Sequence, residues 1–295
     1  MRHVRLVASS WMRFSMRTGG GLMAIFLVLM SGLTVAHLFV TPVEQLIAQA
    51  PDSGHTEAEM AADFAERARN EPGIVDLVKS VTGQDEEEVQ YLLRDQPALL
   101  SVIWLVLLML FPFVTALGSF NQTAGDIGSK GLRYLLLRTR RENVYVGRSF
   151  GTFYFSAASL LILLVLVVMY VGLKLRLYEF GDLLSSGVNA FFALLFLSLP
   201  YIALCGWLSS MFHSAFGSLA VCVIAVGGPI VLFKLIDTLT IAIDLEWMLR
   251  LLPWGWKYDL LSGDVGTRLL AYGVMLGFTA LFFVLGMRHF ARRDL

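Results

Sequence analysis

Charged residues are scarce in this chain and are missing from long parts of it. Charged side chains make up 16% of the 295 residues, hydrophobic ones make up 57%, and no Asp, Glu, Lys or Arg occurs between Asp182 and Lys234. The mean hydropathy is +0.69. A soluble globular domain carries about 25% charged residues, so we expect a membrane protein whose surroundings are mostly lipid.

Cysteine is nearly absent, since only Cys205 and Cys222 occur, both within apolar stretches. Two small buried hydrophobic side chains are the simpler interpretation of this pair, and a disulfide or a shared metal is the alternative. No cluster of Cys and His residues has the spacing of a metal site, and no nucleophile elbow occurs. We therefore predict no catalytic residue, no bound metal and no cofactor in this chain.

Two further features are missing, and each bears on the class of membrane protein. The chain has no Gly-x-x-x-x-Gly-Lys-Ser/Thr loop to hold nucleotide phosphates, so ATP hydrolysis of that kind needs a separate subunit. The apolar stretches carry no carboxylate or lysine at mid-depth, where a charge is costly and usually serves proton or sodium transport. This absence argues against a secondary transporter, although backbone carbonyls alone can hold sodium.

Six apolar stretches are long enough to cross a bilayer as helices, because about 20 residues at about 1.5 Å each span a hydrocarbon core of about 30 Å. They predict an all-α fold, namely a polytopic membrane protein with six transmembrane helices, an N-terminal interfacial helix and a small helical extracytoplasmic insertion. The predicted spans are residues 20–40, 98–120, 150–173, 188–208, 215–235 and 269–287.

Helix-breaking residues lie inside three of the predicted spans. Pro112 is expected to kink the second span, and Pro200 lies within the fourth. In the fifth span, the sequence Gly227-Gly228-Pro229 fits either a discontinuous helix or a kink. We therefore expect helix breaks at these positions.

The N-terminal segment, residues 1–19, carries four arginines and no acidic residue. Val4, Val7, Trp11 and Phe14 recur in it at three- and four-residue steps. This spacing is typical of a helix that lies on a membrane surface with its arginines near anionic headgroups. A targeting peptide is the alternative. A cleavable signal peptide is not expected, because the apolar stretch that follows has the full length of a span.

Residues 41–97 form a polar insertion with thirteen acidic and four basic residues. Thr56 and Glu59 have the spacing of a capping box at the start of a helix, and two further short helices are expected after it. The acidic run from Asp85 to Glu88 suits either calcium or the N-terminus of a helix, whose dipole favours acids. We predict a small helical cap, which is a candidate contact surface for an extracytoplasmic protein.

Residues 237–268 alternate apolar and charged residues and are rich in aromatic ones. Tryptophan and tyrosine gather where a membrane meets water, so we predict interfacial or re-entrant helices with an aromatic belt. The span that follows contains Gly273-x-x-x-Gly277, which is either a close helix contact or a chance occurrence. The aromatic residues of the belt are Trp247, Trp254, Trp256 and Tyr258.

Basic residues gather in three segments, residues 1–19, 121–149 and 288–295. Together these hold 13 basic and 3 acidic residues, so 10 basic and 20 acidic residues remain elsewhere out of 23 of each. The positive-inside rule places such segments in the cytoplasm. We therefore predict a multi-pass protein of the bacterial plasma (inner) membrane with both termini, including the tail of residues 288–295, inside.

The segment of residues 121–149 lies between the second and third predicted spans and carries six basic residues against two acidic ones. Leu132, Leu135 and Leu136 recur in it at helical spacing, with arginines on the other side. This pattern is typical of an amphipathic helix on a membrane surface, and equally of a helix that docks a soluble partner. Headgroup anchoring and protein docking both stay open for these arginines.

The order of residues in this segment resembles the cytoplasmic segment of ABC exporter permeases of the second type. In that family an acidic residue and Gly-Thr-Leu lead into a Leu-Leu helix, then a Pro-containing turn ends in Arg and a Gly-Lys opens the third span. This chain has Arg138-Thr139-Arg140-Arg141 at the turn, without the proline. The hydropathy layout also resembles that family over nearly the whole chain. The matching positions are Asp126, Gly131, Leu132, Leu135, Leu136, Arg141, Gly147 and Arg148.

The resemblance implies the membrane subunit of an ATP-driven exporter, paired with two copies of an ABC ATPase subunit and with a second copy of itself or a paralogous permease. ATP and Mg²⁺ then bind in the ATPase subunit, and no nucleic acid is implied. The 121–149 segment couples the subunits, with its leucines on the permease body and its basic side toward the ATPase. The coupling residues are Asp126, Gly131, Leu132, Arg133, Tyr134, Leu135, Leu136, Arg138, Arg140, Arg141 and Arg148.

Spans with little polar lining favour a lipidic or amphipathic substrate that moves outward. Two rival functions stay open. In the first, the membrane subunit relays ATPase strokes to an extracytoplasmic partner and nothing crosses the membrane. The second is a membrane-embedded enzyme acting on lipid, which needs polar residues converging at one depth, whereas Asn189, His37 and His213 are scattered in the sequence.

Overall fold

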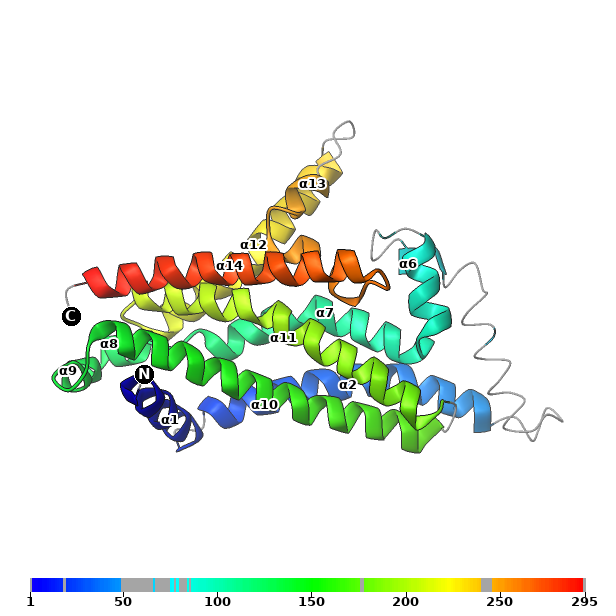
Figure 1. The fold of residues 1–295 in the computed structure, drawn as a ribbon, viewed down its shortest axis with the longest axis horizontal. Helices are drawn as coiled ribbons and strands as arrows, with labels where there is room; N and C mark the ends of the chain where they lie inside the picture. The colour runs from blue at the N-terminus through cyan, green and yellow to red at the C-terminus, as the bar shows by residue number, and fades with distance from the viewer. Residues whose placement is uncertain are drawn as a thin grey trace.

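The computed structural model describes residues 2–17, 20–48, 66, 75–76, 78–79, 84, 86–175, 178–239 and 246–293, and every regular element within them is a helix. Six helices are long and apolar enough to cross a membrane, which confirms the predicted all-α polytopic membrane fold. Most of them run along the long axis of the molecule (Figure 1). The six are α2 (Gly20–Ala48), α7 (Ala98–Ser119), α10 (Arg141–Leu175), α11 (Phe180–Met211), α12 (Ala215–Leu239) and α14 (Val265–Arg292).

Several of these helices extend past the apolar stretches that predicted them. α10 begins at Arg141, inside the 121–149 segment, and α11 begins at Phe180, before the apolar stretch that starts at residue 188. Hydropathy marks only the part of a helix that lies in hydrocarbon, whereas backbone hydrogen bonding continues into the interface. The end of the 121–149 segment is therefore joined to the third span by one continuous helix.

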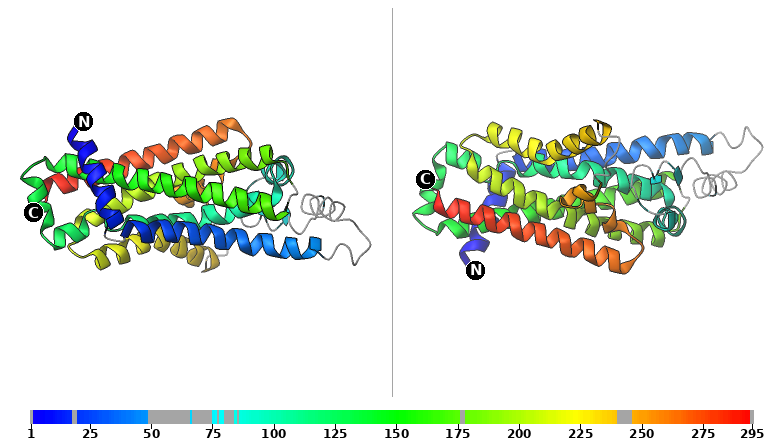
Figure 2. Two further views of the ribbon diagram at one scale, coloured as in Figure 1. Left: turned by 90° about the horizontal axis from the view of Figure 1, so that it is seen from below. Right: turned by 90° about the horizontal axis from the view of Figure 1, so that it is seen from above.

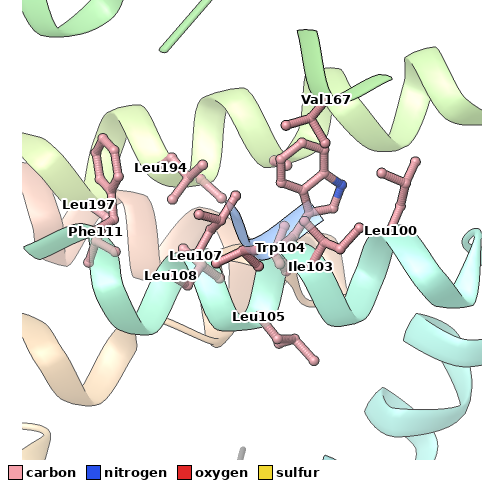
Figure 3. Packing of buried hydrophobic residues seen from close by; sticks show 14 of the residues in the cluster. Leu100, Ile103, Trp104, Leu105, Leu107, Leu108, Phe111, Val167, Leu194 and Leu197 are labelled. Carbon is pink, nitrogen blue, oxygen red and sulfur yellow. The ribbon is translucent and has the colours of Figure 1, made fainter. Parts of the chain in front are cut away.

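The central helix of the bundle is α7, the most buried of the six spans. Figure 3 shows its side chains facing Val167 of α10 and Leu194 of α11. Because lipid tails are as apolar as leucine, close van der Waals packing holds such helices together in a membrane. The least buried spans are α12 and α14. The large apolar side chains of α7 that are at most 1% exposed are Leu100, Ile103, Leu107, Leu108 and Phe111.

The helix-breaking residues do not interrupt the spans. α7 continues through Pro112, α11 continues through Pro200, and α12 continues through Gly227-Gly228-Pro229. A broken helix would expose unpaired backbone groups to hydrocarbon, at several kcal/mol each, whereas a proline within a helix leaves few groups unpaired. Of the two alternatives for the fifth span, the structure therefore has the continuous helix.

The N-terminal helix α1 (Arg2–Arg17) lies across one end of the bundle, at a steep angle to the spans (Figure 2). Two glycines of α10 let it approach closely. A Cβ at Gly147 would lie 2.7 Å from the Cβ of Val7, and a Cβ at Gly151 would lie 2.8 Å from the Cδ1 of Trp11. The arginines of α1 whose side chains are described are exposed. The helix therefore has the amphipathic character that its sequence predicts.

Most of the predicted cap, including the capping box of Thr56 and Glu59, lies outside the described residues. Its last part is described: α6 (Glu86–Gln90) is followed by a π-helical turn, η1 (Tyr91–Asp95). The three glutamates of the acidic run, Glu86, Glu87 and Glu88, stand in the first turn of α6, where the helix dipole favours them. Within the described residues, no group of three His, Cys, Asp or Glu side chains could hold a metal ion.

The turn before α14 engages two carboxylates by hydrogen bonds. Glu88 of α6 accepts from the hydroxyl of Ser262 and from the backbone N–H of Gly263, the latter at 3.0 Å. Asp264 caps α14 by accepting from the backbone N–H of Thr267 at 2.7 Å. This hydrogen bond holds the pKa of the Asp264 carboxyl below its usual range. The described part of the insertion, through Glu88 of α6, is therefore attached to the turn at which the sixth span begins.

In the described part of residues 237–268, where interfacial or re-entrant helices are predicted, the structure has short helical elements, and their place at a membrane interface stays a prediction. Pro253 and Gly255 lie among these short elements. At Gly255 the chain passes so close to Leu249 that a Cβ would lie only 2.4 Å from its backbone oxygen. The last residues of the segment belong to α14, which begins at Val265. The short elements are α13 (Glu246–Leu249), η2 (Pro253–Trp256) and η3 (Asp259–Leu261).

The close approach of α1 to α10 can be tested by substitution. Gly147→Ala places a methyl group 2.7 Å from Val7 and 3.0 Å from the backbone oxygen of Val4, so α1 must shift. We expect a loss of about 1–3 kcal/mol, the usual result of overpacking, seen as a lower thermal midpoint of the purified protein in detergent.

The matched control is Gly181→Ala on α11, where a Cβ would meet nothing within 4 Å among the described residues. Its midpoint should stay unchanged or rise slightly, since alanine is the better helix former. An equal loss in both variants would contradict the close contact between α1 and α10.

Candidate functional site

The 121–149 segment, α1 and the C-terminal end of α14 lie together at one end of the bundle, which we call the basic end (Figures 1 and 2). The segment folds into two short helices, α8 (Ala124–Gly128) and α9 (Gly131–Leu136), before α10 begins. Between them Lys130 adopts the left-handed conformation with φ 60°, which reverses the direction of the chain.

The first half of the segment is held tightly against the body of the bundle. The side chain of Asn121 accepts a hydrogen bond from the backbone N–H of Gly125 at 2.8 Å, which pairs one of the free N–H groups in the first turn of α8. A Cβ at Gly128 would lie 2.1 Å from the backbone oxygen of His213, in the turn between α11 and α12. Only glycine fits such a close backbone approach.

A small apolar cluster holds the second half. Leu132 is 1% exposed and packs with Ile127, Val144, Tyr145 and Phe290, and Leu136 packs against the same cluster. These leucines face the bundle, where the sequence pattern placed them. Leu135 instead lines a cavity of about 320 Å³ beneath α1, together with Gly131.

The outer face of the segment is basic and partly apolar. Arg133, Arg138 and Arg140 are exposed, as are Tyr134 and Leu137, with 77% and 84% of their surfaces accessible. We call these five residues the basic ledge. A hollow of about 580 Å³, lined in part by Arg133, Leu137 and Arg140, lies on it. Arginine and aromatic side chains around an apolar centre are typical of protein interfaces.

Asp126 and Arg148 do not belong to the ledge, because they form an ion pair in which Arg148 is buried and Asp126 is partly buried. The side chain of Arg148 is 3% exposed; it also donates to the backbone oxygen of Gln122 at 2.8 Å, and its guanidinium lies 4.8 Å from the ring centroid of Trp11. A buried charge is tolerated only when it is paired and hydrogen-bonded. These contacts fasten α8, the end of α7 and α1 to α10.

Arg141 is also used inside the molecule. Its guanidinium donates to the backbone oxygens of Ala291 and Arg293 at the end of α14, the former at 3.2 Å. Arg293 in turn donates to the backbone oxygen of Ser210 and contacts the ring of His213. Cations at the C-terminal carbonyls of helices are favoured by the helix dipole. The start of α10 is thereby tied to the ends of α14 and α11.

Sequence reasoning missed two polar residues that position the segment. The hydroxyl of Ser209 accepts hydrogen bonds from the backbone N–H groups of Thr123 and Ala124, each at 3.0 Å. The amide of Gln122 donates to the backbone oxygen of Ile202 at 2.9 Å. Both residues lie at the ends of apolar spans in the sequence. Because buried polar groups are almost always hydrogen-bonded, this position could have indicated that they bind other parts of the chain.

The internal ion pair gives the second test. Asp126→Asn and Arg148→Met should each lower stability by about 2 kcal/mol or more, because each leaves a charge without its partner. The double variant should lose clearly less than the sum, since the two residues interact directly. The measurement is a double-mutant cycle on the thermal midpoint in detergent.

The control is Lys174→Met, which breaks the exposed pair of Lys174 and Glu44 at the other end of the bundle, with 45% and 36% of the side chains accessible. Exposed pairs contribute about 0–1 kcal/mol, so this change should have little effect. Strictly additive losses at Asp126 and Arg148 would show that the two side chains do not act as a pair.

The chain matches no model of a known protein family, and no curated protein is similar to it in sequence. What the structure establishes is therefore coarser than the family resemblance: the chain is an all-helical, polytopic membrane protein with six helices able to span a bilayer. The resemblance to ABC exporter permeases comes from the sequence alone, namely from the residues of the 121–149 segment and from the hydropathy layout.

Proposed function

We propose that this chain is the membrane subunit of an ATP-driven ABC exporter, that the basic ledge docks a separate ATPase subunit, and that the substrate is lipidic or amphipathic. The observation that carries the proposal is the division of the five arginines of the 121–149 segment into two sets. Arg133, Arg138 and Arg140 point outward, while Arg141 and Arg148 are bound inside. A docking surface needs both the exposed charges and a rigid attachment to the bundle.

The attachment suits the transmission of force. The ledge is followed directly by α10, which runs without interruption from Arg141 to Leu175. A push on the ledge therefore acts on the end of a spanning helix and, through Arg141, on the end of α14. Closure of two ATPase subunits on nucleotide would supply such a push in this proposal.

The distribution of charge supports a cytoplasmic position for the basic end. The three segments that gather there hold 13 basic and 3 acidic residues, and the structure brings them to the same end of the bundle. The positive-inside rule requires this arrangement of the cytoplasmic side of an inner-membrane protein. A soluble ATPase would then reach the ledge from the cytoplasm.

A second membrane subunit is part of the proposal. α12 and α14 are the least buried spans, and among the described residues nothing lies within 4 Å of a Cβ at Gly273 or Gly277. Small residues on an open helix face allow another helix to pack closely. A second copy of this chain, or a paralogue, would enclose the path for the substrate.

The docking role is tested by reversing the charges of the ledge. The triple variant Arg133→Glu, Arg138→Glu, Arg140→Glu should weaken binding of the ATPase subunit at least about tenfold, equal to about 1.4 kcal/mol, because three attractive contacts become repulsive. Its thermal midpoint should hardly change, since exposed substitutions have small effects. Co-purification of the ATPase and ATP hydrolysis by the reconstituted complex are the measurements.

The matched control is the double variant Arg5→Glu, Arg13→Glu, which reverses two charges that are exposed at the same end but belong to α1. Equal losses in both variants would assign the ledge to lipid-headgroup anchoring, and unchanged ATPase binding in the triple variant would remove the docking role. If the intact complex hydrolyses ATP but moves no lipid or amphiphile across vesicles, the relay of ATPase strokes to an extracytoplasmic partner takes the place of export.

A further inference from the structure

A cavity lies beneath α1 at the basic end, where α1, α8 and α9 come together (Figure 1). Its volume is about 320 Å³, which is within the usual range of sites that bind small molecules. We call it the α1 cavity. The residues of the cavity that carry the argument are Trp11, Phe14, Asp126, Gly131, Leu135 and Arg148.

Two charged side chains line the α1 cavity, and only one of them is open to it. The side chain of Arg148 is 3% exposed, whereas that of Asp126 is 24% exposed. Oδ2 of Asp126 pairs with Arg148, and within the described residues Oδ1 makes no hydrogen bond. A Cβ at Gly131 would lie 3.9 Å from this Oδ1, so the glycine leaves the oxygen uncovered. The cavity therefore presents a negatively charged acceptor.

The group that binds to this oxygen must donate hydrogen bonds. Hydrogen bonds between an ionised donor and a carboxylate are about twice as strong as neutral ones, so a cationic donor is favoured. A primary ammonium has three N–H groups to donate, whereas a trimethylammonium group has none. A water molecule needs two to four polar partners, which the rest of this cavity hardly supplies.

The other walls of the cavity are mostly apolar and aromatic. The rings of Trp11 and Phe14 stack with their centroids 6.0 Å apart, and Leu135 contributes the wall formed by α9. A second cavity of about 120 Å³ shares Trp11 and Phe14 with the first and is lined further on by Ala24 of α2 and Leu117 of α7. An apolar chain attached to the ammonium group can therefore extend from the α1 cavity toward the spans.

The surroundings of the cavity are basic, which favours a zwitterion over a bare cation. Arg17 follows Ser10 by seven residues and Phe14 by three, so it lies on the cavity face of α1, and its side chain is exposed. A positively charged surface repels a free cation. An ammonium that carries its own phosphate is neutral overall, and arginine is well suited to bind the phosphate.

From these observations we propose that the α1 cavity binds the headgroup of one ethanolamine phospholipid, whose ammonium donates to Oδ1 of Asp126 and whose chains follow the second cavity to the spans. The lipid links α1 to α8 and α9 and remains bound as part of the structure, so it is not the exported substrate. All of these contacts lie within this chain. The proposal therefore stands or falls independently of an ATPase partner.

The test uses the purified full chain in discs of phosphatidylcholine, in which phosphatidylethanolamine with the same acyl chains replaces part of the lipid. The ethanolamine lipid should raise the thermal midpoint by roughly 3 °C in a saturable manner. Mono- and dimethylated ethanolamine lipids should give progressively smaller shifts, because each methyl group removes a donor. Leu135→Trp, which fills the cavity, and Gly131→Val, which covers Oδ1 of Asp126, should each abolish the shift.

The matched control is Leu137→Trp, which adds the same side chain on the same segment at a position 84% exposed and outside the cavity; it should keep the shift. Equal midpoints in the two lipids would overturn the proposal, as would a shift that survives in Leu135→Trp and Gly131→Val, which would show a general effect of the bilayer. An equal shift with phosphatidylglycerol, or with phenethylamine added to phosphatidylcholine discs, would also overturn it and assign the cavity to an anionic headgroup or to a soluble amine.

Discussion

The guanidinium of Arg148 is a charge placed where almost no water reaches, and the arrangement of the basic end depends on satisfying it. Its partners come from three other parts of the chain: the carboxylate of Asp126, the backbone oxygen of Gln122 and the ring of Trp11. None of these groups can move away without leaving a buried charge unpaired, which is strongly unfavourable. The ion pair therefore gives α1, α7, α8 and α10 one fixed arrangement.

The same end uses its other basic residues in two further ways. Arg141 and Arg293 donate to carbonyl groups at the ends of α14 and α11, where no residue follows in the helix to pair them. Arg133, Arg138 and Arg140 lie exposed on the ledge instead of at the end of another helix. The arginines of one short segment thus differ in role because some reach carbonyls or a carboxylate and others do not.

Buried and partly buried polar groups have different kinds of partner at the two ends of the bundle. At the basic end, buried charges meet opposite charges and backbone carbonyls. At the other end, the carboxylates of Glu88 and Asp264 accept hydrogen bonds from backbone and hydroxyl donors, while Ser101, Trp104 and Arg268 line a pocket. Between the ends, α7 packs with apolar side chains, consistent with spans that carry no mid-depth charge.

The sequence by itself determined the number of spanning helices, the amphipathic N-terminal helix and the inward orientation of Leu132 and Leu136. These features follow from local periodicity and from the length of apolar stretches, which depend only on neighbouring residues. The sequence also showed where the helix-breaking residues lie, but not that α12 continues through Gly227-Gly228-Pro229. Whether a helix continues there depends on the cost of exposing unpaired backbone groups to lipid and on the helices packed beside it.

Only the tertiary structure decided which basic residues are exposed. Arg148 and Arg133 look alike in the sequence, yet one is paired with Asp126 beneath α1 and the other lies open. The partners of Arg141 are carbonyls about 150 residues further along the chain, and Asn189 and Trp104 line one pocket only because α11 packs beside α7. Pairing of buried polar groups is a long-range condition, so it is set when the helices pack and cannot be read from a local pattern.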